Sequence, residues 1–363
     1  MPRVIGVDPG TLSIDLCGLD DGRLFLDRTL PTAEALADPG AFVALLEAEA
    51  PLDLVAGPSG YGLPLTPARD ATDDDLRLAY LAADGEPGGI GGLRALARAL
   101  ARSALPVVLT PGVIHLASVP EHRKVNRVDM GTADKLCATA LAVHEQCARR
   151  GCAPAETSLV LLELGGAFTA AVAVQGGRVV DGVGGSSGPI GARAPGALDG
   201  EVAFLAGAVP KGLLFTGGAA AVAGTADASA EQLAAPTTAR GRVAWAALVE
   251  GAVKAVAALA AASVPAPHEV VLSGRLTAVA GVTDELARRL APVVHGAEVR
   301  PLAGFARVAK HGAQGAALIA DGLAGGRAEP LVEALGVREA RGTALDHLYV
   351  LSPADARRRL GVA

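Results

Sequence analysis

Aromatic residues are scarce in this chain of 363 residues, since Phe, Trp and Tyr together make up 3% of it. Hydrophobic residues nevertheless make up 51%, which excludes a disordered chain. A core built from Ala, Gly, Leu and Val favours helices packed closely on strands over an aromatic-rich β-sandwich. We therefore expect an α/β protein, and the length predicts two domains of ordinary size.

Cysteine is also scarce, and Cys17, Cys137, Cys147 and Cys152 form no Cys-x-x-Cys pair. The seven His residues are dispersed along the chain. Neither a zinc site nor a disulfide framework is therefore expected. This cysteine usage fits a reducing cytoplasm, where we expect the protein to be located.

No strongly charged or strongly apolar segment dominates the chain. The net charge is −6 and there is no Lys/Arg stripe with interleaved aromatic residues, so nucleic acid is not an expected partner. The N-terminus leads directly into a predicted strand, without the apolar region of a signal peptide. The Ala-rich stretch 246–262 carries Glu250 and Lys254, which argues against a membrane span.

The most informative stretch is Arg3-Val-Ile-Gly-Val-Asp-Pro-Gly-Thr-Leu-Ser13. Its apolar run predicts a buried strand, and Gly10 allows a tight turn whose consecutive N–H groups can point at an anion. Thr11 and Ser13 add hydroxyl donors, and Asp8 is placed to orient the water shell of Mg²⁺. The stretch predicts a phosphate site with its metal, and an ordinary hairpin turn is the alternative.

The layout of residues 3–30 is repeated near the middle of the chain. Strand patterns at 158–164, 168–174 and 178–183, separated by glycine turns, predict a second three-strand meander. Its first turn carries Glu163, Gly165 and Gly166. Two meanders, each with an acidic residue and glycines at its first turn, predict a duplicated fold with a ligand between the halves.

The other segments alternate between helix and strand patterns, which predicts parallel strands covered by helices. Helices are predicted at 33–50, 93–103, 240–262, 282–290 and 307–323, with another capped by Thr132 and ending near Arg150, and strands at 14–19, 23–30, 52–56, 106–109, 269–272 and 298–301. The loop 57–62 is a candidate ligand loop. The polar stretch 66–92 is either a substrate lid or a solvated insertion, and residues from Gly325 onward are expected on the surface.

Five segments, in this order, resemble motifs of the superfamily that contains acetate kinases, sugar kinases, heat-shock ATPases and actin. They are Val7-Asp-Pro-Gly-Thr11 and Leu162-Glu-Leu-Gly-Gly-Ala-Phe-Thr169 (phosphate motifs), Val270-Val-Leu-Ser-Gly-Arg275 (adenosine motif), and the helices after Gly131 and from His311 (connecting helices). The stretch 188–202 is similar to the pattern that follows the second phosphate motif in predicted butyrate kinases. The resemblance implies a two-lobed actin-like ATPase fold, with duplicated ribonuclease H-like domains whose mixed five-stranded sheets are flanked by helices.

The resemblance also implies how the chain is divided. We expect one lobe at 1–152 with an insertion at 66–92, a second lobe at 153–325, and a tail at 326–363. The last helix of the second lobe, 307–323, is expected to pack back on the first lobe. A homodimer is implied as well.

The sequence departs from the superfamily at two places. The second phosphate motif has Glu163 where Asp is usual, one methylene longer. The Asp-Thr pair and Gly-Thr-Ser-His segment of acetate kinases are absent, and the chain has 110–115 and 131–134 there instead. ATP binding is therefore better supported than acyl phosphate chemistry.

The resemblance assigns roles in binding ATP and Mg²⁺. Asp8 and Glu163 would hold Mg²⁺ through water. The phosphates would contact Gly10, Thr11, Ser13, Gly165, Gly166 and Thr169, with Gly217 and Gly218 bordering the nucleotide and Gly274 and Arg275 against adenine and ribose. Tight turns without a ligand are the alternative.

Arg193 is the candidate cation for the transition state, because a guanidinium can bind a carboxylate or phosphate bidentately. A surface Arg is the alternative. Asp199 either orients Arg193 or is solvated. Asp134, which lies beside Lys135 at the start of the helix after Gly131, is either a base for a hydroxyl substrate or an N-terminal helix acid.

These residues predict an ATP- and Mg²⁺-dependent kinase of a small molecule, most similar to kinases of short carboxylates. A kinase of a hydroxyl compound and an ATPase that activates a partner enzyme are alternatives within the same fold. A non-catalytic, nucleotide-dependent interaction protein is an alternative from another class.

Overall fold

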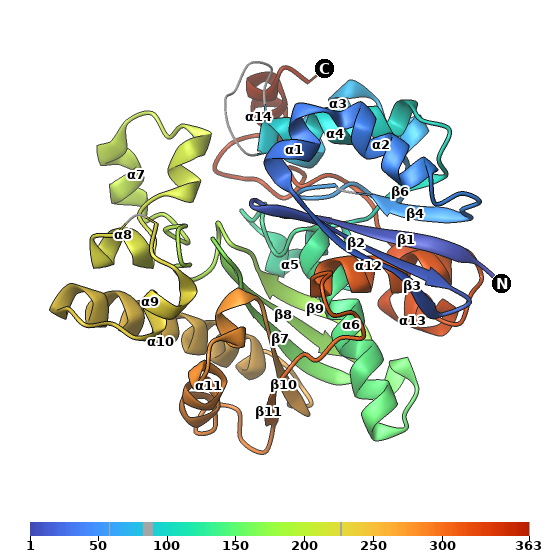
Figure 1. Cartoon of the computed structure of the whole chain (residues 1–363). Coiled ribbons are helices and arrows are strands. Elements are labelled where there is room, and N and C mark those ends of the chain that lie inside the picture. Colours follow the sequence, from blue (N-terminus) through green and yellow to red (C-terminus); the bar gives the residue numbers. More distant parts are fainter. Residues whose placement is uncertain (58, 83–89, 226, 363) are drawn as a thin grey trace.

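The computed structural model describes residues 1–57, 59–82, 90–225 and 227–362. Two β-sheets, one from each half of the chain, lie with helices packed on them and between them (Figure 1). Each sheet mixes parallel and antiparallel strands. The α/β class, the mixed sheets and the duplicated meander predicted from the sequence are confirmed.

The first sheet has the strand order β3-β2-β1-β4-β6-β5. Its strands are β1 (Arg3–Pro9), β2 (Ser13–Asp20), β3 (Arg23–Pro31), β4 (Leu54–Gly57), β5 (Thr66–Pro67) and β6 (Val107–Leu109). β1, β2 and β3 form the antiparallel meander, and β4 and β6 extend it in parallel. Five strands were expected in this sheet, and the structure has a sixth. It is the two-residue strand β5, which pairs with β6 at the edge of the sheet.

The second sheet has the strand order β11-β10-β7-β8-β9, which repeats the first sheet without β5. Its strands are β7 (Ser158–Leu164), β8 (Thr169–Gln175), β9 (Arg178–Val183), β10 (Glu269–Ser273) and β11 (Glu298–Pro301). Asp8 and Glu163 are each the next-to-last residue of the first strand of their meander. The two turns that carry them are therefore equivalent in the two halves.

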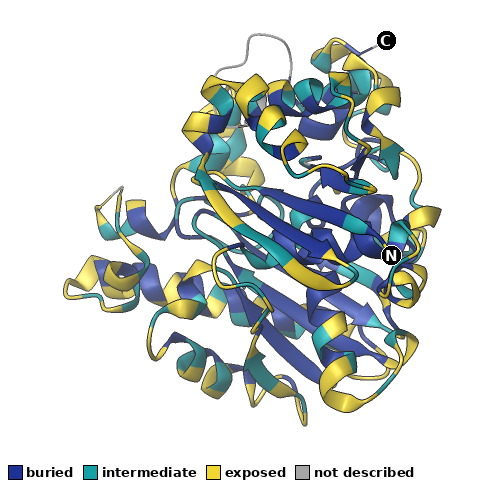
Figure 2. Ribbon diagram, turned by 45° about the vertical axis from the view of Figure 1, so that its right-hand side comes forward, coloured by how far each residue is buried: buried dark blue, intermediate teal, exposed yellow. Residues whose placement is uncertain are grey.

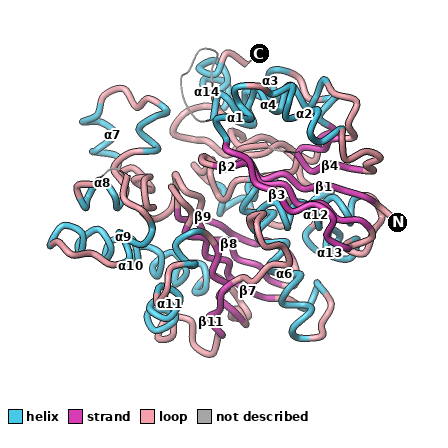
Figure 3. The backbone as a smooth tube through the Cα atoms, in the orientation of Figure 1, coloured by secondary structure: helices cyan, strands magenta, loops and turns pink. Residues whose placement is uncertain are grey.

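Two helices, α6 (Ala133–Arg150) and α12 (His311–Leu323), lie between the sheets and contact each other (Figure 3). Glycines bring their backbones close to their neighbours. A Cβ added to Gly6 of β1 would lie 2.2 Å from the Ala317 nitrogen of α12. A Cβ added to Gly315 would lie 1.7 Å from the Cys137 carbonyl oxygen of α6. These contacts leave no space for a larger side chain, and Cys137 and Ala317 belong to the largest core cluster. Most strand residues are buried (Figure 2).

Besides α6, these α-helices precede α12 in the chain. They are α1 (Thr32–Ala37), α2 (Pro39–Glu47), α3 (Asp73–Tyr80), α4 (Ile90–Arg102), α5 (Glu121–Lys124), α7 (Gly200–Ala206), α8 (Ala219–Ala223), α9 (Ala230–Ala234), α10 (Ala239–Ala261) and α11 (Val282–Leu290). The helix predicted at 33–50 is divided into α1 and α2, because Asp38 ends the first and Pro39 begins the second.

The part of the stretch 66–92 that the structure describes is more than a solvated insertion. It contains β5, the 3-10 helix Ala68–Asp70 and α3, whose Leu76 and Tyr80 are fully buried. Thr72 and Asp75 form a capping box at the start of α3. Residues 83–89 lie outside the described part of the chain, and with them the start of the glycine run 88–92.

The expectation that the chain after Gly325 decorates the surface is wrong for its first part. Helix α13 (Glu329–Leu335) buries Leu331, Val332 and Leu335 in the largest core cluster. Helix α14 (Pro353–Leu360) buries Ala356 beside Leu78 of α3. Charged residues on the outer faces of these helices hide their apolar spacing in the sequence.

Helix α10 is the one helix among the described residues that is long and apolar enough to cross a membrane. Core helices of soluble proteins satisfy the same criterion. α10 buries Leu248, Val249 and Val256 in the core of the second sheet.

Candidate functional site

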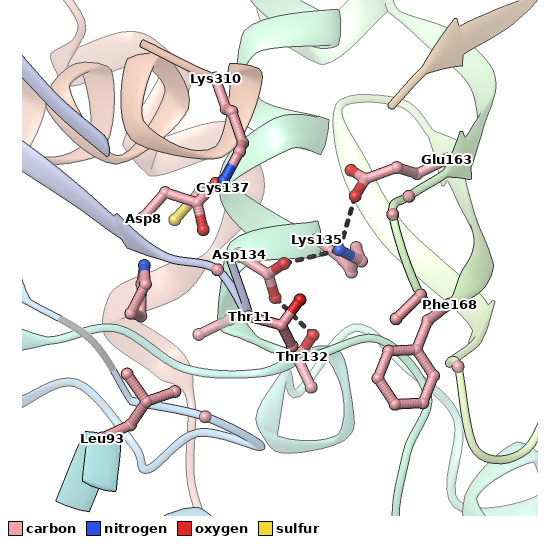
Figure 4. Close-up of a pocket in the computed structure, with 18 of the residues that line it drawn as sticks. Asp8, Thr11, Leu93, Thr132, Asp134, Lys135, Cys137, Glu163, Phe168 and Lys310 are labelled. Atoms are coloured by element: carbon pink, nitrogen blue, oxygen red, sulfur yellow. Dashed lines mark hydrogen bonds and ion pairs between the residues drawn. The ribbon is translucent and has the colours of Figure 1, made fainter. Parts of the chain in front are cut away.

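Two cavities lie between the sheets and meet at the turns that follow β1 and β7. Their volumes are about 220 Å³ and about 480 Å³. Both are lined by Asp8, Asp134, Glu163, Gly274, Arg275 and Lys310. Figure 4 shows Asp8, Asp134, Glu163 and Lys310 around a common space. Leu93 and Phe168 line the smaller cavity.

The two phosphate turns close in the same way. The Gly10 N–H donates to the Ser13 carbonyl over 2.9 Å, and the Gly165 N–H donates to the Phe168 carbonyl over 2.8 Å. These two N–H groups are therefore used inside their turns. Gly10 and Gly165 shape the turns, so that a phosphate would have to be bound by other donors of the same turns, such as the hydroxyl of Thr11.

Lys310 covers the first phosphate turn. Its ammonium lies 2.7 Å from an Asp15 carboxylate oxygen and donates to the Ser13 carbonyl over 3.2 Å. A Cβ added to Gly10 would lie 2.6 Å from the Lys310 Nζ atom. Lys310 is the residue before α12, so the second connecting helix places a cation directly over the turn.

Lys135 joins carboxylates from two elements. Its Nζ atom lies 2.6 Å from an Asp134 oxygen and 2.6 Å from a Glu163 oxygen (Figure 4). Burial opposes the charged ammonium, but the two carboxylates outweigh it and hold the pKa of Lys135 well above its usual value. The Thr132 hydroxyl donates to Asp134 and does not cap α6.

Asp8 has a carboxyl group whose pKa its surroundings raise. Burial, with the negative charges of Asp134 and Glu163, raises its pKa to about 7, and Lys310 and Lys135 act in the opposite direction. A Cβ added to Gly312, in the first turn of α12, would lie 2.7 Å from an Asp8 oxygen. A carboxyl group with this pKa can both hold and release a proton near neutral pH.

The smaller cavity has an apolar wall made by residues far apart in the sequence. Leu12, Tyr61, Leu93, Phe168 and Phe215 line it. The Phe168 and Phe215 rings meet edge to face with centroids 5.2 Å apart. Part of the loop 57–62 lines the same cavity, as predicted for a ligand loop, and Pro58 lies outside the described residues.

The structure brings many of the predicted site residues to these cavities. Asp8, Gly10, Thr11, Asp134, Glu163, Gly165, Gly166, Gly274 and Arg275 line the smaller cavity, and Ser13 lines the larger one. A Cβ added to Gly166 would lie 3.7 Å from the Arg275 Cδ atom, so Arg275 lies beside the turn that follows β7.

Five predicted residues do not line either cavity. They are Thr169, Arg193, Asp199, Gly217 and Gly218. Thr169 is buried at the start of β8, and the carboxylate of Asp199 caps α7 by accepting from the Glu201 and Val202 N–H groups. The Arg193 N–H donates to the Ala167 carbonyl, and the Gly218 N–H to the Arg193 carbonyl. Their roles in catalysis or nucleotide binding stay predictions.

Several lining residues escaped the sequence analysis. Lys310 directly precedes the segment from His311 that resembles a connecting helix, so its position was the available signal. The Ser273 hydroxyl shares a hydrogen bond of 2.8 Å with His311, whose pKa is lowered by burial. Asp129 accepts from the Ser186 N–H and hydroxyl and from the Gly131 N–H, which joins the loop after β9 to the loop before α6.

The acids of the site fit a hydrated Mg²⁺ ion. Among the described residues, no group of three or more His, Cys, Asp or Glu side chains is placed to chelate a metal directly. Asp8, Asp134 and Glu163 nevertheless face the cavities with carboxylate oxygens, the donors that Mg²⁺ prefers, and Mg²⁺ commonly keeps several waters. These residues suit a metal held through water and substrate phosphates.

Comparisons with known proteins agree with the fold. A family model described as "protein of unknown function (DUF1464)" matches residues 6–350. Similar solved structures include a propionate kinase from Francisella tularensis subsp. tularensis SCHU S4, with 13% identity and a TM-score of 0.62 over 87% of this chain and 99% of that one. An acetate kinase from Porphyromonas gingivalis has 14% identity and a TM-score of 0.60 over 87% and 98%.

An acetate kinase from Entamoeba histolytica, with 10% identity, has a TM-score of 0.57 over 80% of this chain and 86% of that one. No curated protein sequence matches the chain significantly. At these identities the similarity shows the fold alone, and this is the fold that the predicted superfamily implies.

Proposed function

The chain belongs to the DUF1464 family of proteins of unknown function, and from this premise we propose that it is an ATP- and Mg²⁺-dependent kinase of a small molecule. The observation that carries the proposal is the junction of two cavities at Asp8, Asp134 and Glu163. A kinase needs a nucleotide and an acceptor on opposite sides of the transferred phosphoryl group, with charges placed where they meet. The kinase fold of the structural neighbours supports the same function.

In this proposal, Asp8 and Glu163 hold Mg²⁺ through water, and the two phosphate turns hold the phosphates of ATP. Bound Mg²⁺ supplies positive charge that neutralises the phosphate oxygens. Lys310, over the first turn, and Arg275, beside the second, are the side chains of this chain that would bind phosphate oxygens. The apolar wall of the smaller cavity would exclude water from the acceptor.

A short carboxylate is the acceptor that we propose. The neighbours named propionate kinase and acetate kinase support it, and so does the apolar wall, which suits a short aliphatic chain. A carboxylate oxygen would form a bond to the γ-phosphorus while the bond from this phosphorus to the β,γ-bridging oxygen breaks, and ADP leaves. No proton moves in this step. The chain needs only to orient the acceptor and offset the charge of two anions.

A hydroxyl compound is the second candidate, and Asp134 and Asp8 favour it. Both carboxyl groups line the smaller cavity. Transfer to a hydroxyl group would release its proton, and a carboxylate of this site would accept it.

One assay separates these functions. The protein is incubated with ATP, Mg²⁺ and a panel of short carboxylates and hydroxyl compounds, and acyl phosphates are trapped with hydroxylamine. Hydroxamate that depends on both ATP and a carboxylate is the expected result. ADP release that depends on a hydroxyl compound, without hydroxamate, would contradict a carboxylate acceptor and support a hydroxyl acceptor. Measurable ATP binding without turnover would favour a nucleotide-dependent interaction protein and contradict the kinase.

A further inference from the structure

Lys135 lies near the N-terminus of α6, where the helix dipole disfavours a positive charge. It is the third residue of α6, where the helix dipole presents its positive end. Its side chain is only 13% exposed, and burial also opposes its charge. The two carboxylate contacts of 2.6 Å therefore provide the interaction that keeps an ammonium here.

Those contacts place the ammonium between two carboxylates that also face the substrate cavities. Asp134 comes from α6, and Glu163 comes from the second phosphate turn. Asp8 lies close enough for both acids to raise its pKa. Without Lys135 these carboxylates would repel one another in a partly buried space, so the ammonium performs the neutralisation that a bound cation would perform.

We propose that Lys135 is an exchangeable cation of the site, so that a divalent cation and the Lys135 ammonium compete for the Asp134 and Glu163 carboxylates. The proposal rests on the proposed function, which places a metal beside Glu163, and it adds Asp134 to the carboxylates that attract this metal. A divalent ion carries twice the charge of the ammonium and binds carboxylate oxygens well. Lys135 itself lines the smaller cavity, so its flexible four-carbon stem has space in which to move when it is displaced.

Lys310 is the contrasting case in the same site. Its ammonium is held by Asp15 and the Ser13 carbonyl, and no hydrogen bond or ion pair joins it to Asp134 or Glu163 in the described structure. A metal at the Asp134 and Glu163 pair would therefore leave the contacts of Lys310 intact. The exchange is a property of Lys135.

The experiment measures Mn²⁺ binding by electron paramagnetic resonance, in the full chain without nucleotide. We expect Lys135→Met to bind Mn²⁺ at least about tenfold more tightly than the wild type, because the carboxylate pair loses its competitor. Lys254→Met is the matched control, since Lys254 forms an exposed ion pair with Glu250 on α10, and its Mn²⁺ affinity should equal that of the wild type. Folding of each variant is checked by circular dichroism.

Lys135→Arg provides a second, independent measurement if Lys135→Met does not fold. A guanidinium binds carboxylates bidentately and should compete more strongly than the ammonium, so the Mn²⁺ affinity should fall below that of the wild type. Equal or weaker Mn²⁺ binding by folded Lys135→Met, or unchanged binding by Lys135→Arg, would overturn the exchange. The measurement contains no ATP, so a protein that shows the exchange but transfers no phosphoryl group would contradict only the proposed kinase.

Discussion

At the scale of single residues, the sequence around Asp8 and Glu163 predicts that the two acids form a pair. Each ends an apolar strand and is followed by glycine within three residues, so the local pattern alone pairs them. The structure places both at the junction of the two cavities. Lys310 could not be assigned to the site from the sequence, because it falls inside the helix predicted at 307–323, and only the packing of α12 on β1 brings it over the turn.

Glu163→Gln should lower phosphoryl transfer on the order of 100-fold, since it removes a charge from the site and keeps the shape of the side chain. The measurement is ADP release with the acceptor that the assay above identifies. Asp199→Asn is the matched control, because Asp199 caps α7 outside both cavities, and its turnover should stay within about twofold of the wild type. Equal activity of Glu163→Gln and the wild type would remove Glu163 from the catalytic site.

The sequence predicts a catalytic role for Arg193, whereas the structure places this residue outside both cavities. Its side chain lines neither cavity, whereas its backbone N–H binds Ala167 beside the second phosphate turn. Arg193→Ala keeps that backbone bond, so we now expect turnover within about threefold of the wild type. A loss on the order of 100-fold at unchanged ATP affinity would make Arg193 the transition-state cation after all.

At the scale of elements, the loop between β11 and α12 is fixed by one side chain of the other sheet. The carboxylate of Asp27 in β3 accepts the N–H groups of Arg307, Val308 and Ala309 over distances of 2.6 to 3.1 Å. Lys310 follows directly. The helix predicted from residue 307 begins at His311, because residues 307–309 lie in the loop that Asp27 holds and Lys310 has an extended backbone with φ −61° and ψ 163°.

The anchor gives a pH dependence with a defined sign. Burial acts to raise the pKa of Asp27, but the three backbone donors outweigh it and hold this pKa below the usual value. The ionised group therefore stabilises the folded state above the unfolded pKa of about 4, and this contribution is lost as the pH falls through the lower folded pKa. Asp27→Asn should reduce the free energy of unfolding at pH 7, and the difference from the wild type should shrink toward pH 3.

Urea unfolding at both pH values measures this difference. Asp53→Asn serves as a comparison, since Asp53 accepts only the Arg3 N–H at an exposed position. A difference for Asp27→Asn that is the same at pH 7 and pH 3 would contradict the assigned role of the carboxylate.

At the scale of the whole molecule, the repeated meander was readable because its strands and turns are local patterns. The cavity wall was not, since Tyr61, Phe168 and Phe215 come from segments separated by up to 154 residues and meet only in the folded chain. The C-terminal helices α13 and α14 could not be predicted from the sequence for another reason. Leu331, Val332 and Leu335 occupy one face of a short helix within a charged stretch, and their burial depends on the α12 surface that receives them.

Removal of residues 326–363 should therefore prevent stable folding. It takes three large apolar side chains of α13 from the core, each contributing about 1.5–3 kcal/mol, against a typical net stability of about 5–15 kcal/mol. A shorter truncation after Ser352 removes only α14 and should fold with a lower Tm. Thermal unfolding and solubility compare the two. A soluble, cooperatively folding chain that ends at Gly325 would contradict the placement of α13.

The backbone contacts at Gly6 and Gly315 leave no space for a ring where α12 meets β1 and α6. Two of the six Phe residues, Phe168 and Phe215, line the smaller cavity instead. In a protein labelled only on its Phe rings, a nuclear magnetic resonance spectrum would contain few aromatic signals. Because one ring lies edge to face against the other, a molecule that enters the cavity would shift both signals together.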